Sequence, residues 1–63
     1  MKKEAMDALE ALVDEFTLGA VLEMLERICH RKAENIRNHW KDEILAKFWE
    51  KAARQIEQIK VDI

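Results

Sequence analysis

The sequence predicts an all-helical fold: a helical hairpin preceded by a short N-terminal helix, with two chains associating into a homodimeric helical bundle. The 63 residues include no proline and one glycine, and alanine, leucine, glutamate, lysine and arginine dominate, so helix propensity is high along the whole chain. When every residue is placed on one ideal helix, the apolar stripe changes side twice, near residues 17 and 40. Each change indicates a change of chain direction, because one straight helix cannot bury opposite sides against a single core.

The first helix is expected at residues 3–15, where apolar residues recur at intervals of three and four. The second is expected at residues 18–37. It follows Thr17, a residue type that accepts hydrogen bonds from the free N–H groups at a helix start. A chain of this length can hold one small helical domain, so the domain is expected to span residues 1–63.

The third helix is expected at residues 42–60, because Asp42 and Glu43 place negative charge in its first turn, where the helix dipole favours it. Asn38 is of a residue type that can end the preceding helix in the left-handed conformation. The alternative is one unbroken helix over residues 18–60 that uses its two faces on different partners. The change of stripe direction favours the hairpin.

Self-association is predicted because a single chain of this size is only marginally stable. One cysteine cannot form an intramolecular disulfide, and no Cys and His spacing resembles a structural zinc site. The apolar stripe of the third predicted helix is about 140° wide, more than the roughly 100° that one core covers. We therefore expect a homodimer in which two hairpins form a four-helix bundle. The expected interface residues are Leu25, Cys29, Phe48, Trp49, Ala52 and Ile56.

The charge of the chain is close to balanced, with a net charge of -2. Residues 1–26 hold two basic and seven acidic residues, net -5, whereas residues 27–63 hold nine basic and six acidic residues, net +3. This asymmetry indicates that the two ends face each other or a polar partner. The longest apolar run, residues 18–22, is far too short to cross a bilayer, so we expect a cytoplasmic protein that does not enter membranes.

The stretch of residues 29–43 contains the only cysteine and both histidines, but its spacing does not favour a site. Cys29 and His30 are adjacent, and neighbouring side chains on a helix do not face one another. His30 shares a column with Glu26 and Glu34 on a polar face, where a divalent metal could bridge His30 and one carboxylate. Zinc takes three or four protein ligands, however, and the same surface carries the repelling charge of Arg27, Arg31 and Arg37. We therefore expect Cys29 to be buried, and we expect no catalytic, cofactor-binding or metal-binding residues.

A basic cluster crosses the same stretch and is the best candidate for a phosphate-binding surface. It is offset only by Glu34, and a nucleic acid would be its natural ligand. No recognisable nucleic-acid-binding motif and no overall basic balance accompany it, so nucleic-acid association is the alternative function rather than the first. The cluster comprises Arg27, Arg31, Lys32, Arg37 and Lys41.

The sequence contains no glycine-rich phosphate loop, no nucleophile paired with a base and no inward pair of carboxylates. Residues 18–34 and 48–57 resemble small helical proteins of bacterial and phage genomes, and this resemblance implies no activity. The predicted function is therefore that of a small non-enzymatic interaction or regulatory protein, which binds a protein partner through apolar helical faces. The identity of that partner is not encoded in any motif.

Overall fold

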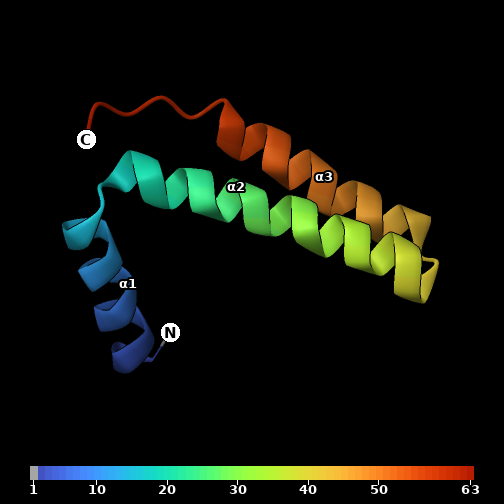
Figure 1. The fold of residues 1–63 in the computed structure, drawn as a ribbon, viewed down its shortest axis with the longest axis horizontal. Helices are drawn as coiled ribbons and strands as arrows, with labels where there is room; N and C mark the ends of the chain where they lie inside the picture. The colour runs from blue at the N-terminus through green and yellow to red at the C-terminus, as the bar shows by residue number, and fades with distance from the viewer. Residues whose placement is uncertain (1) are drawn as a thin grey trace.

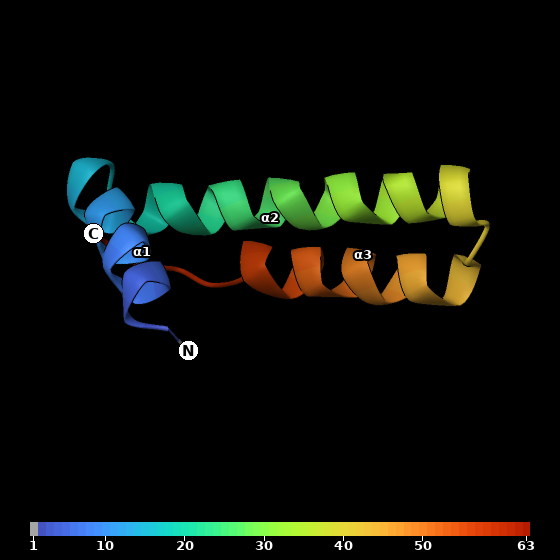
Figure 2. The same ribbon diagram turned by 90° about the horizontal axis from the view of Figure 1, so that it is seen from below.

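The computed structural model describes residues 2–63 and is all-helical over them, with no strand. Met1, part of the predicted domain of residues 1–63, lies outside the described residues. Helices α2 and α3 run antiparallel and side by side, and α1 leaves the start of α2 and points away from this hairpin (Figures 1 and 2). The elements are α1 (Lys3–Glu15), α2 (Leu18–Asn35), the π-helical turn η1 (Ile36–Trp40) and α3 (Glu43–Glu57).

The prediction of an all-helical fold is confirmed. Helix α1 has the bounds expected from the sequence, and α3 ends at Glu57, before the expected end at residue 60. The alternative of one continuous helix over residues 18–60 is wrong, because the chain reverses direction between α2 and α3 (Figure 2). The change in stripe direction near residue 40 therefore marks a real turn.

Side-chain caps begin both helices of the hairpin. The Thr17 hydroxyl accepts a hydrogen bond of 3.0 Å from the backbone N–H of Ala20, and a carboxylate oxygen of Asp42 accepts one of 3.0 Å from the backbone N–H of Leu45. Each cap satisfies one of the N–H groups that have no partner within the first turn of a helix. The two caps fix where α2 and α3 begin.

The turn between α2 and α3 differs from the expectation at Asn38. Asn38 lies inside η1, and the residue in the left-handed conformation is Lys41, with φ 56° and ψ 29°. The last turn of α2 widens into a π-helical turn, so the chain continues helically through Trp40 before it reverses. A side chain at positive φ brings its Cβ close to the carbonyl oxygen, which costs about 1 kcal/mol at any residue other than glycine.

Lys41→Gly should therefore raise the free energy of unfolding by about 0.5–1 kcal/mol, because glycine adopts this conformation without the Cβ contact. Urea denaturation followed by circular dichroism measures the change. Lys41→Ala is the matched control, since it removes the charged side chain but keeps the Cβ, and it should give no gain. Equal stabilities of the glycine and alanine variants would show that the conformation of residue 41 does not limit stability.

The contact between α2 and α3 is made by small side chains. Ala46 and Ala53 of α3 are 0% exposed, and they lie seven residues apart, which places them on one face two helical turns apart. A methyl group lets the two helix axes approach closely, since the axial distance depends on the side chains at the contact. We call the buried residues of the two helices the seam: Val21, Cys29, Ala33, Ala46 and Ala53.

The chain is open for its size. Its accessible surface is 5439 Å², whereas a compact monomer of the same mass exposes roughly 4,200 Å². Its radius of gyration is 13.6 Å, against about 11 Å for a compact domain of this length. Helix α1 contributes to the difference, because none of its residues is buried and it contacts no other helix than α2 within residues 2–63.

Candidate protein-interaction surface

Large apolar side chains of α3 lie outside the seam and are exposed. Ile44, Leu45 and Phe48 are 73%, 43% and 63% exposed. Phe48 lies three residues after Leu45 and four after Ile44, so it neighbours both on the helix surface. Their exposure follows from the seam, because the alanines occupy the face of α3 that contacts α2. The prediction that one partner helix would not cover the whole apolar stripe of α3 agrees with this arrangement.

Helix α2 adds apolar residues on the same side of the hairpin. Leu25 and Ile28 are 38% and 41% exposed. Lys32 lies one turn after Ile28, and its ammonium nitrogen is 5.7 Å from the centroid of the Trp49 ring, within the range of a cation–π interaction. Because Trp49 lies one turn after Leu45 on α3, this contact shows that the exposed residues of the two helices border the seam on one side.

We call this side of the hairpin the apolar face. Of the predicted interface residues, Leu25 and Phe48 are exposed on it, and Trp49, Ala52 and Ile56 are half-buried beside the seam. Cys29 lies in the seam itself and is buried within a single chain. Ile28 and Leu45 belong to the face but were not among the predicted interface residues. The apolar face is defined by Leu25, Ile28, Leu45, Phe48, Trp49 and Ala52.

The opposite side of the hairpin carries a group of ion pairs around Arg37. The Nε atom of Arg37 donates to both carboxylate oxygens of Glu43 at 3.0 Å. Its two terminal nitrogens donate to the carboxylate of Glu50 at 3.0 and 3.1 Å. These hydrogen bonds raise the pKa of Arg37 and lower the pKa values of Glu43 and Glu50. The group links η1 to the first half of α3.

The Arg37 group should make hairpin stability depend on pH on the acid side. The pKa values of Glu43 and Glu50 lie below their ordinary value of 4.5 in the folded chain. The ion pairs therefore stabilise the fold above that pH, and this stabilisation is lost as the pH falls through the lowered values. Arg37, whose pKa is raised, remains charged over the whole acid range.

We expect the free energy of unfolding, measured by urea denaturation, to fall less between about pH 6 and about pH 3 in Arg37→Met than in the wild type. Arg31→Met is the control, because it removes a guanidinium from α2 and leaves the Arg37 group intact, and it should keep the wild-type pH dependence. An unchanged pH dependence in Arg37→Met would contradict the assignment.

The basic cluster is partly occupied by contacts within the chain. Arg37 is bound to two carboxylates, and Arg27 pairs with Glu23 at 2.9 Å. Lys32 lies over the Trp49 ring. These contacts reduce the charge that the cluster offers to a phosphate group. The remaining members are Arg31 on α2 and Lys41 in the turn.

The histidine column is only partly formed. His30 Nε2 lies 3.2 Å from a carboxylate oxygen of Glu26, and the His30 side chain is 52% exposed. Within residues 2–63, no three His, Cys, Asp or Glu side chains are grouped so that they could hold a metal ion. The geometry here is that of a surface pair one helical turn apart, with His30 exposed and Glu26 half-buried, and such pairs contribute little to stability.

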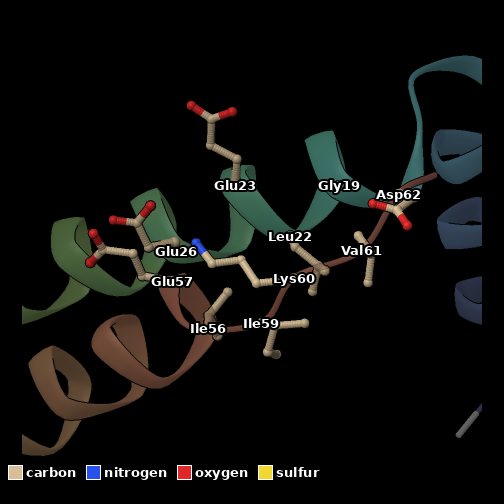
Figure 3. Close-up of a pocket in the computed structure, with 10 residues that line it drawn as sticks. All are labelled: Gly19, Leu22, Glu23, Glu26, Ile56, Glu57, Ile59, Lys60, Val61 and Asp62. Carbon is tan, nitrogen blue, oxygen red and sulfur yellow. The ribbon is translucent and has the colours of Figure 1, made fainter.

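The segment after α3 returns to the start of α2 and forms an open groove of about 410 Å³ there. The backbone N–H of Gly19 donates to the carbonyl oxygen of Ile63 at 2.7 Å. A Cβ at Gly19 would lie 3.3 Å from that oxygen, so only glycine permits this close approach without displacement of the neighbour. The Lys60 side chain points toward the carboxylates of Glu26 and Glu57 (Figure 3).

The chain was compared with protein-family models, with curated proteins and with solved structures. None of them matches. No helix within the described residues is long and apolar enough to cross a bilayer. The apolar face is the most distinctive feature of the surface of the described residues.

Proposed function

We propose that the protein is a small, non-enzymatic interaction or regulatory protein of the cytoplasm. It binds a protein partner through its apolar helical faces, and its first partner is a second copy of itself. The observation that carries this proposal is the exposure of Phe48, 63%, beside Leu45 and Ile28 on one side of the hairpin. Exposed apolar residues that gather on one side of a small protein mark interaction sites, whereas scattered ones do not.

The exposed area supports pairing of two chains. The chain exposes roughly 1,200 Å² more than a compact monomer of its mass would. A specific protein interface of standard size buries about 800 Å² on each partner. If a partner covered the apolar face and the apolar stripe of α1, the accessible surface of the chain would fall to about that of a compact monomer of the same mass. The stripe of α1 consists of Met6, Leu9, Leu12, Val13 and Phe16.

Sedimentation equilibrium between about 1 and 200 µM tests the proposal. We expect a species of twice the chain mass of 7.5 kDa, and a thermal midpoint that rises with protein concentration, because association stabilises the folded state by mass action. A folded species of single-chain mass at every concentration would overturn the pairing of two copies.

Fluorescence polarisation with a labelled DNA oligonucleotide, at low and moderate salt, tests the alternative function. Binding that weakens steeply with salt would favour nucleic-acid association through the basic cluster, because phosphate contacts release counterions. We expect no such binding, since Arg27 and Arg37 are already paired with carboxylates.

A further inference from the structure

We infer that in the homodimer α1 of each chain packs on the apolar face of the partner copy, with its acidic side chains against the cationic edge of the partner's α2. This inference rests on the proposed function, since it assumes that two copies pair. It goes further by naming the segment that covers the apolar face and the charges that orient it. The reasons are the exposure of α1, its charge and its position relative to α2.

Helix α1 has an apolar stripe that its own chain leaves uncovered. Met6, Leu9 and Phe16 are 54%, 43% and 50% exposed, and no residue of α1 is buried. An isolated helix of 13 residues is marginal in water, and most helical stability in proteins comes from packing of an apolar side. Helix α1 therefore requires a surface to pack against, and α2 of the same chain meets only one end of it (Figure 1).

The charges of α1 and of the hairpin are complementary but do not meet within one chain. Helix α1 carries five acidic residues and one lysine, net -4. The ion pairs of the described chain involve Glu23, Glu26, Glu43 and Glu50, and none involves an acidic residue of α1. On α2, Arg27 and Arg31 lie one turn apart and form the cationic edge, in which Arg27 also makes an exposed ion pair of 2.9 Å with Glu23 of its own helix.

The position of α1 explains why these charges cannot meet within one chain. Thr17, where α1 joins α2, precedes Arg27 and Arg31 by 10 and 14 residues, which is roughly 15–21 Å along a helix. Helix α1 points away from the hairpin at this junction (Figure 1). A two-fold axis that sets α2 antiparallel to the partner's α2 would bring α1 onto the partner's apolar face, beside its cationic edge. Helix α1 is about 20 Å long, so it spans that edge.

A charge-exchange experiment tests the inference. One variant carries Glu10→Lys and Asp14→Lys in α1, and a second carries Arg27→Glu and Arg31→Glu in α2. Each variant alone should dimerise about tenfold or more weakly than the wild type, because like charges then face each other at both symmetric contacts. An equimolar mixture should dimerise nearly as well as the wild type, because each α1 now faces a partner of opposite charge. Sedimentation velocity on fluorescently labelled chains measures the dimer, and circular dichroism checks that each variant is helical.

In the matched control, only the α1 variant is labelled, and it is mixed with an unlabelled Lys47→Glu, Lys51→Glu variant, whose changes lie on the outer side of α3. The labelled chain should recover far less than in the first mixture, because its α1 still faces like charge. Recovery only in the first mixture supports the exchange of α1 between copies. If both variants dimerise like the wild type, or if mixing restores nothing, the placement of α1 is wrong while pairing of the copies stands. If the wild-type chain does not dimerise, the proposed function and this inference both fail.

Discussion

Ala53→Leu should largely unfold the hairpin. Ala53 is 0% exposed in the seam, where α2 and α3 approach closely, so three additional carbon atoms have no space. Overpacking of this kind typically costs 1–3 kcal/mol, on the order of the total stability of a small helical domain. The two helices must separate to accommodate leucine, and separation also removes the contacts of Ala46 and Ala33. Ala53→Leu therefore acts on the fold of the single chain, before any partner binds.

Ala52→Leu is the matched control for this substitution. Ala52 is the neighbouring residue with the same side chain, but it is half-buried at the edge of the seam on the apolar face, so a leucine there can extend outward. Urea denaturation followed by circular dichroism should show a large loss of stability for Ala53→Leu and little change for Ala52→Leu. Equal stabilities of the two variants would mean that the seam is not closely packed at residue 53.

The residues of the seam could be predicted from the sequence only in part. Apolar periodicity located both chain breaks, and the residue type of Thr17 indicated the cap that begins α2. Asp42 was expected only to place negative charge in the first turn of the third helix, whereas its side chain caps α3. Periodicity weighted by hydrophobicity favours large residues, however, so it singled out Phe48 and Trp49 of the third helix and gave no role to Ala46 and Ala53. The spacing of Ala46 and Ala53 by seven residues was the available signal, because small residues repeated every two turns permit close approach of two helices.

The Arg37 group could not be predicted for a different reason. The sequence placed Arg37 in a basic cluster with its neighbours on the second helix, and its partners Glu43 and Glu50 belong to α3. Which residues of two antiparallel helices face each other depends on the length and geometry of the turn between them. That turn is a π-helical segment followed by Lys41 in the left-handed conformation, and neither feature has a clear signature in the residues concerned. Local patterns therefore predicted the helices, but not the register between them.

Phe48→Glu should abolish association of the chains while it leaves the hairpin helical. Phe48 is 63% exposed in the single chain, so a carboxylate at this position remains in water as long as the chain is monomeric. In the proposed dimer the same position is covered by the partner, and an unpaired carboxylate there costs several kcal/mol. We expect the dissociation constant measured by sedimentation equilibrium to rise by at least about 100-fold.

Lys47→Glu is the control for Phe48→Glu, because residue 47 lies about 100° around the helix, away from the apolar face. It changes the net charge by more than Phe48→Glu does, so an effect of charge alone would weaken association at least as strongly. Association lost in Phe48→Glu and kept in Lys47→Glu would locate the interface on the apolar face. The thermal midpoint of Phe48→Glu should also become independent of protein concentration, since no dimer remains to stabilise it. A Phe48→Glu chain that still dimerises like the wild type would place the interface elsewhere, and the exposed side of α3 would then have to serve another partner.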